Sequence, residues 1–265
     1  MTKKTKSTLF HDKIAEKYES LYTDPYWQLY FKVTWHNLKK YIPKKKKAII
    51  LDAGGGTGLW SRKLAKLGFD LVCTDIAQKM LDIGFKQAKK EKLDKQIEFK
   101  NVDITNMKCF KDNSFDMVIA QGDPVGYCDN PQKAIKELSR VAKKGAHVSV
   151  SIDSFYSMIG RFLSGKDFKS LDKLLKIHIS EFAGEYPQYN FTIDELKKMF
   201  ETSGFKVVDI IGKLVFTRFI PRENLNKILT DEKFFKKILK IENQFNNEPS
   251  IVGLSGHIQI TGKKT

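Results

Sequence analysis

Short apolar segments alternate along the chain with longer segments whose apolar residues recur every three or four positions. The short segments have the length and continuous apolar character of strands buried on both faces of a sheet. They fall at residues 48–52, 69–74, 97–102, 115–121, 147–153, 205–211 and 257–262, the sixth continuing through 214–216. Strands separated by helices are typical of βαβ units. The pattern therefore predicts an α/β fold with a doubly wound, mostly parallel sheet of seven strands and helices on both faces.

The longer segments have the periodicity of amphipathic helices. Helices are predicted at 7–22 with Ser7 as the cap, from Pro25 to before Pro43, and at 59–67, 78–90, 132–141, 194–203 and 224–246. The segment from Ser154 to about Phe191 is longer than a βα connection requires, and its apolar spacing is helical. We interpret this segment as a helical insertion that caps a site.

Composition places the chain among globular proteins, with 41% hydrophobic and 29% charged residues. The longest apolar runs are too short to cross a bilayer, and no apolar stretch follows the basic N-terminus, so neither a membrane span nor a secretory signal is predicted. Cys73, Cys109 and Cys128 have no CxxC spacing. An odd number of cysteines favours reduced thiols, and hence a cytoplasmic location.

The net charge of +16 is concentrated at the N-terminus, where residues 1–47 hold twelve lysines and four acidic residues. A positive field accelerates the approach of nucleic acid or of an anionic small molecule. This region lacks the interleaved aromatic or arginine-rich motifs of nucleic-acid-binding segments, so solvated lysine faces are the preferred interpretation.

A glycine-rich turn, Gly54-Gly55-Gly56-Thr57-Gly58, lies between the first predicted strand and the helix after it. Glycines here permit a sharp turn and let a ligand approach the backbone, while the helix directs free N–H groups at that ligand. Asp75 follows at the end of the second strand, where an acidic residue meets ribose hydroxyls in dinucleotide folds. The residues alone therefore predict an adenosine-type ligand. No His, Cys or Asp cluster has metal-ligand spacing, and no metal is expected.

With the preceding aspartate, the pattern Asp52-x-Gly54-x-Gly56-x-Gly58 resembles the first motif of the class I S-adenosylmethionine-dependent methyltransferases. The resemblance covers residues 48–153 and reappears at both ends of the chain. It is carried by Phe10-x-x-x-Ala-x-x-Tyr18, Asn101-Val-Asp-Ile104, Glu137-Leu-Ser-Arg-Val141, Phe191-Thr-x-x-Glu-Leu196, Ser203-Gly-Phe205 and Gly256-His-Ile258. It implies a Rossmann-like fold and an enzyme that uses S-adenosylmethionine and releases S-adenosylhomocysteine.

The resemblance also implies one domain with four parts and a role for each motif residue. The parts are a helical lid (1–45), a cofactor-binding core (46–153), a helical cap (154–192) and the remainder of the core (193–265). Asp52 would orient the glycine loop or reach the methionine amino group through water, and Tyr18 would be a lid residue. The other implied contacts are Gly54 and Gly56 under the methionine and ribose, Asp75 on both ribose hydroxyls, Ile76 and Met80 on the adenine, Asp103 on its amine with Ile104 alongside, and Gln121 and Gly122 beside the methionine.

A nicotinamide cofactor is the main competitor for the same turn. Its fingerprint places a third glycine or alanine at the position that Leu59 occupies here. This departure favours the methyl donor over an oxidoreductase.

Catalytic residues are harder to identify, because methyl transfer from a sulfonium needs alignment and exclusion of water more than a strong base. Asp123 and Tyr127 follow the fourth strand in a loop that faintly resembles the Asp-Pro-Pro-Tyr motif of amino-methylating nucleic-acid enzymes. The second proline is absent, so the loop looks more like that of small-molecule methyltransferases. A structural Asp-Pro turn is an equal alternative.

Histidines supply one further candidate. His178 lies in the predicted insertion and could face a substrate as a general base, whereas His147 and His257 are interpreted as structural strand residues. We therefore expect methyl transfer to a nucleophilic O, N or C of a small molecule. The alternatives are an RNA or tRNA methyltransferase, suggested by the charge, and a non-enzymatic module that binds the donor. The sequence carries no signal for an oligomeric state.

Overall fold

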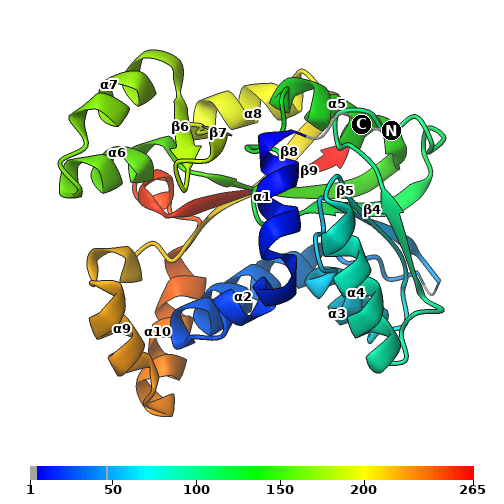
Figure 1. Ribbon diagram of the computed structural model, residues 1–265, viewed down its shortest axis with the longest axis horizontal. Coiled ribbons are helices and arrows are strands. Elements are labelled where there is room, and N and C mark those ends of the chain that lie inside the picture. Colours follow the sequence, from blue (N-terminus) through cyan, green and yellow to red (C-terminus); the bar gives the residue numbers. More distant parts are fainter. Residues whose placement is uncertain (1–4, 46) are drawn as a thin grey trace.

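Seven strands form one sheet in the order β3-β2-β1-β4-β5-β9-β8 (Figure 1). This computed structural model describes residues 5–45 and 47–265. The strands are β1 (Ile49–Ala53), β2 (Asp70–Asp75), β3 (Ile97–Asn101), β4 (Phe115–Ala120), β5 (Ala142–Asp153), β8 (Phe205–Lys213) and β9 (His257–Lys264). The first five are parallel, and β9 runs antiparallel to both β5 and β8. The predicted doubly wound sheet of seven strands is confirmed, and its order reverses between β1 and β4.

Helices cover both faces of this sheet, as predicted. They are α1 (Lys6–Ile14), α2 (Pro25–Leu38), α3 (Leu59–Ala65), α4 (Gln78–Lys90), α5 (Pro131–Val141), α6 (Phe155–Ser164), α7 (Phe168–Ile177), α8 (Ile193–Glu201), α9 (Arg222–Leu229) and α10 (Glu232–Phe245). Within the described residues, no helix is long and apolar enough to span a membrane. Lys3, Lys4 and Lys46, part of the basic N-terminal region, lie outside the described residues.

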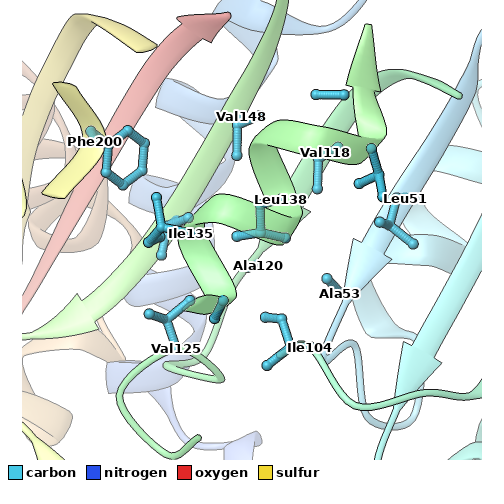
Figure 2. Close-up of a cluster of buried hydrophobic side chains, with 14 of the residues drawn as sticks. Leu51, Ala53, Ile104, Val118, Ala120, Val125, Ile135, Leu138, Val148 and Phe200 are labelled. Carbon is cyan, nitrogen blue, oxygen red and sulfur yellow. The ribbon is translucent and has the colours of Figure 1, made fainter. Parts of the chain in front are cut away.

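The central strands are buried on both faces, which explains their continuous apolar character. In β4, Val118 and Ala120 belong to an apolar cluster that includes residues of α5 and α8, whereas Met117 and Ile119 belong to a cluster that includes residues of α2, α3 and α4. Figure 2 shows part of the first of these clusters, with Leu138 of α5 lying between Ile135 and Val118. Because side chains alternate between the faces of a strand, a strand covered on both sides is apolar at most positions.

Several predicted boundaries are corrected by the structure. The first helix begins at Lys6 and is capped by Thr5, whose Oγ1 accepts from the Thr8 N–H (3.1 Å), and not by Ser7. It ends at Ile14, and short 3₁₀ turns continue to Tyr22. The predicted helix 224–246 is two helices, because Asp231 caps α10 by accepting from two backbone N–H groups. The sixth strand stops at Lys213, since Leu214 adopts φ +58° and turns the chain.

The insertion contains more than helices. After α6 and α7, strands β6 (Ile179–Phe182) and β7 (Tyr186–Tyr189) form an antiparallel hairpin that the sequence pattern did not reveal. Its turn has positive φ at Ala183 and Gly184. In Figure 1 the insertion forms one lobe and α9 with α10 forms another, both on the same side of the sheet.

A buried carboxylate attaches the turn after β8 to α10. Glu242 is fully buried, and its two oxygens accept from the backbone N–H groups of Val215 (2.8 Å), Phe216 (3.1 Å) and Thr217 (2.9 Å). The Thr217 hydroxyl donates to the same carboxylate (2.9 Å). This side chain therefore positions the 3₁₀ helix η4 (Thr217–Phe219), which follows directly.

Glu242→Gln should lower the free energy of unfolding by ~1–3 kcal/mol, because an amide NH₂ would face backbone donors that then lack an acceptor. Urea denaturation followed by circular dichroism measures the change. The matched control is Glu232→Gln in the exposed first turn of the same helix, where a change within about 0.5 kcal/mol is expected. Equal unfolding midpoints for the two variants would contradict this role of Glu242.

Candidate functional site

A cavity of about 920 Å³ opens at the carboxyl ends of β1 to β5. Its volume lies in the range of small-molecule sites, and its position beside the β1/β4 reversal is where open α/β sheets bind ligands. One group of lining residues comes from the loops after β1, β2, β3 and β4. A second group comes from α2, α6, η4, α9 and the facing ends of β5 and β9. We call these groups the loop side and the helix side.

The glycine turn forms the floor of the loop side. Gly54 has φ +68°, and a Cβ there would lie 2.3 Å from the Cβ of Pro124. Gly56 has φ +57°, and a Cβ there would lie 3.0 Å from the Met80 Cε. Both the left-handed backbone and the lack of space require glycine. The backbone of the turn is therefore directly accessible from the cavity.

Asp75 joins the loops that follow β1 and β2. Its Oδ2 accepts from the Gly56 N–H (3.0 Å) and its Oδ1 from the Ala77 N–H (2.8 Å). Burial raises the pKa of this carboxyl, and the two backbone N–H groups oppose that effect. Asn101 supports the same loop by donating to the carbonyls of Asp75 (3.0 Å) and Ile76 (2.9 Å). The carboxylate is thus held in one orientation at the wall of the cavity.

All but one of the residues implied as donor contacts line this cavity. The lining residues are Tyr18, Gly54, Gly56, Asp75, Ile76, Met80, Asp103, Ile104, Gln121 and Gly122. Their individual roles stay predictions. Besides Asp75, Asp103 and Gln121 have protein partners: Asp103 Oδ1 accepts from the N–H (2.7 Å) and hydroxyl (2.8 Å) of Thr105, and Gln121 donates to the Ser149 carbonyl (3.1 Å).

Asp52 is the exception, because it lies beneath the turn and not in the cavity wall. It is fully buried, and its Oδ2 accepts from the N–H (3.1 Å) and hydroxyl (2.7 Å) of Ser61. Its Oδ1 is buried with no hydrogen-bond partner in the described part of the chain. Burial raises the pKa of Asp52 to about 6, although both Ser61 groups oppose the rise. The carboxylate thus anchors α3 under the glycine turn at a cost in stability.

Asp52→Asn should therefore stabilise the protein at pH 8. The folded protein retains the Asp52 proton up to about pH 6, whereas an unfolded chain releases it near pH ~4, so stability is lost as the pH rises between these values. Asparagine avoids this loss and still accepts hydrogen bonds from Ser61. The free energy of unfolding should therefore rise by ~1–3 kcal/mol at pH 8, and by less at pH 4.5. Chemical denaturation at both pH values, with Asp70→Asn as the exposed control, measures the gain. A gain independent of pH would refute the argument.

Two candidate catalytic residues do not line the cavity, which corrects their expected positions. Asp123 is fully buried with φ +71°, and its oxygens accept from the Gly126 N–H (3.0 Å) and Gln188 Nε2 (2.9 Å). This is the structural Asp-Pro turn. His178 ends α7, stacks on Phe155 with 4.1 Å between ring centroids, and has Nδ1 3.0 Å from Glu195 Oε1. Both side chains are held away from the cavity by tertiary contacts, which a sequence pattern does not reveal.

Tyr127 lines the cavity as expected. Its ring packs against those of His11, Phe182 and Tyr186, with centroids 5.1–6.0 Å apart. Burial raises the pKa of its phenol well above the usual value. Tyr127 is therefore a neutral hydroxyl at neutral pH, within an aromatic cluster that joins α1 to the hairpin of the insertion.

Asp153 and His257 form a pair that the sequence analysis missed. Asp153 ends β5, His257 begins β9, and the antiparallel register places them opposite each other. Their Oδ1 and Nε2 atoms lie 2.7 Å apart, and both residues line the cavity. Burial acts most strongly on the pKa of Asp153 and raises it, but His257, the hydrogen bond from Gln188 and the charge of Arg161 together lower this pKa below its usual value. The pair therefore couples an ionised carboxylate to an imidazole on the helix side.

Lys213 is a second missed residue, at the end of β8. It is almost fully buried, and its Nζ lies 3.0 Å from Gln121 Oε1, 3.0 Å from Ser151 Oγ and 3.4 Å from the Tyr30 hydroxyl. Burial lowers the pKa of its amine well below the usual range. Because it bonds to Gln121, this lysine connects the loop side of the cavity to the helix side.

Comparison with known proteins agrees with this geometry. Residues 50–145, which contain the glycine turn and Asp75, match the family model of a methyltransferase domain. The tRNA 5-carboxymethoxyuridine methyltransferase of Escherichia coli O157:H7 is 19% identical over 260 residues, covering 96% of this chain and 95% of that protein.

Solved structures share the fold. A methyltransferase of Thermotoga maritima, described as a possible histamine N-methyltransferase, has a TM-score of 0.62 at 18% identity and covers 96% of this chain and 98% of its own. Phosphoethanolamine N-methyltransferase 2 of Haemonchus contortus, solved with S-adenosyl-L-methionine, has a TM-score of 0.58 at 17% identity, covering 90% of this chain and 52% of that one. Residues 50–145 therefore form a class I S-adenosylmethionine-dependent methyltransferase domain, and the chain that carries it is an enzyme that uses S-adenosylmethionine.

Proposed function

We propose that this enzyme transfers the methyl group to a nucleophilic atom of a small molecule bound on the helix side of the cavity. The observation that carries the proposal is that one continuous cavity joins the glycine turn to the Asp153–His257 pair. Walls from α2, α6 and α9 surround the helix side, which favours a compact acceptor. The pair favours a nucleophilic oxygen or nitrogen that carries a proton, among the O, N and C acceptors that the family methylates.

The loop side has the chemistry that the donor requires. Asp75 retains lone pairs for ribose hydroxyls while backbone N–H groups hold it in place. Ile76 and Met80 offer apolar surface for the adenine, and Asp103 an acceptor for its amine. Gln121 and Gly122 would border the methionine, Tyr18 would cover the donor, and Asp52 acts from below by fixing α3.

The bound donor would supply an electrophilic methyl group and a good leaving group. The protein then has to align the acceptor, exclude water and receive the acceptor proton. Since Asp153 holds Nε2 of His257, the imidazole carries its proton on Nε2 and leaves the Nδ1 lone pair free. His257 would take the proton at Nδ1, and the ionised Asp153 would stabilise the resulting imidazolium. Tyr30, edge-on to the ring at 5.2 Å, helps to hold its orientation.

Asp75→Ala should weaken S-adenosylhomocysteine binding by ~10- to 100-fold, as expected for the loss of hydrogen bonds to a charged group. Isothermal titration calorimetry measures the dissociation constant. Asp70→Ala, at the exposed opposite end of β2, is the matched control and should bind as the parent does. Unchanged affinity in Asp75→Ala would remove Asp75 from the donor site.

His257→Gln should lower kcat by ~10²–10⁴-fold, the usual contribution of a general base, while S-adenosylhomocysteine affinity stays unchanged. His147→Gln, in the middle of β5 and outside the cavity lining, is the control. A kcat close to that of the parent would mean that His257 only shapes the cavity.

A tRNA acceptor is the second candidate, favoured by the alignment with a tRNA methyltransferase along nearly the whole of both chains. Methyl-labelled donor incubated with a cell extract distinguishes the two acceptors. Label in the low-molecular-weight fraction that survives ribonuclease supports the small-molecule proposal. Label that precipitates with RNA and is lost after ribonuclease supports the tRNA candidate and overturns ours.

A further inference from the structure

The helix side of the cavity contains three arginines from three separate elements. Arg161 lies in α6, Arg218 in η4 and Arg222 at the start of α9, and all three line the cavity. Arg161 is more than fifty positions from Arg218 and Arg222 in the sequence, and it shares a cavity with them only because the insertion and the C-terminal helices form neighbouring lobes (Figure 1). Like charges gathered in one cavity repel each other, so the cluster requires an explanation.

Arg222 is neutralised by the protein itself. Its Nη2 lies 2.9 Å from Asp24 Oδ2, and its guanidinium lies over the rings of Tyr26 (4.3 Å) and Trp27 (5.2 Å). These contacts give Arg222 a structural role that attaches α9 to the start of α2. The unexplained charge therefore belongs to the other two arginines.

Arg218 has no such counter-ion. Its Nη2 donates to the backbone carbonyl of Ser157, and within the described residues neither Arg218 nor Arg161 forms an ion pair with a carboxylate. Burial lowers the pKa of Arg218, Tyr26 and Asp153 oppose that effect, and the charge of Arg161 adds a smaller lowering. Asp153 is already bonded to His257 and Gln188. A half-buried guanidinium beside a second one, without a carboxylate partner, is suited to an anion that arrives with a ligand.

Two glycines leave room around this guanidinium. A Cβ at Gly160 would lie 3.8 Å from Arg218 Nη2, and a Cβ at Gly256 would lie 3.9 Å from Nη1. Gly256 directly precedes His257, so the charge lies close to the proposed base. A side chain at either position would narrow the space in which the planar group presents its donors.

We infer that Arg218 and Arg161 form an anion subsite that binds a carboxylate or phosphate group of the methyl acceptor next to His257. A guanidinium presents paired N–H donors that match the oxygens of either group. The inference rests on the proposed function and adds the charge of the substrate to it. It also limits the acceptor to a molecule whose anionic group lies near the atom that is methylated.

The test uses the full-length enzyme and a small-molecule extract separated on an anion-exchange resin before the assay. Methyl transfer from labelled donor should be confined to the resin-bound fraction. Prior treatment with alkaline phosphatase abolishes the acceptor if its anion is a phosphate monoester, and carbodiimide amidation abolishes it if the anion is a carboxylate. Label in the unbound fraction alone would overturn the anion subsite while leaving the proposed function intact. Label in neither fraction would overturn both.

Variants test the same inference within the protein. Arg218→Gln should lower kcat/KM for the resin-bound acceptor by ~10- to 100-fold, mainly because KM rises. The kcat/KM of Arg218→Lys should lie between those of Arg218→Gln and the parent. Both should bind S-adenosylhomocysteine as the parent does, which shows that they fold. Lys144→Gln, exposed in β5, is the control for the loss of one positive charge. An unchanged KM in Arg218→Gln would overturn the assignment.

Discussion

Burial of the central strands on both faces is the constraint on which the rest of the structure depends. A strand covered by helices on each side has no free face for polar chemistry, so polar groups must gather at its ends. β1 and β4 are largely apolar, and Gly54, Asp75, Asp103, Gln121 and Asp153 all follow or end a strand at the same edge. The reversal of strand order between β1 and β4 separates the loops there and leaves room for a ligand.

The antiparallel strand β9 adds what parallel strands alone would not provide. A parallel neighbour of β5 would bring its own carboxyl end to the cavity, whereas β9 brings its amino end. His257 thereby meets Asp153 by register, 104 positions later in the chain. The same strand end places Gly256 beside Arg218. Acid–base chemistry and anion recognition on the helix side thus both depend on the direction of one strand.

The sequence predicted the loop side well, because its determinants are local. The glycine turn, the acidic residue after β2 and the alternation of strands and helices follow from spacing over short stretches, and the residues named from them line the cavity, Asp52 excepted. The helix side was largely missed. The sequence suggested His178 and Asp123 as catalytic residues. In the folded protein, His178 stacks on Phe155, and Asp123 accepts a hydrogen bond from Gln188 of the insertion. His257 looked structural, because nothing local to it indicates that Asp153 lies opposite.

This division explains why similarity identifies the donor and not the acceptor. The matched methyltransferase domain ends at residue 145, and all the helix-side residues that matter here lie after it: Asp153, Arg161, Lys213, Arg218 and His257. They come from β5, the insertion, β8, η4 and β9, elements whose positions are set by tertiary packing such as the Glu242 anchor. Buried charge is costly wherever it occurs, yet Lys213 and Arg218 are retained at the wall of the cavity. Because these two buried charges cost stability, the best explanation for their presence is that they interact with the molecule that binds in the cavity.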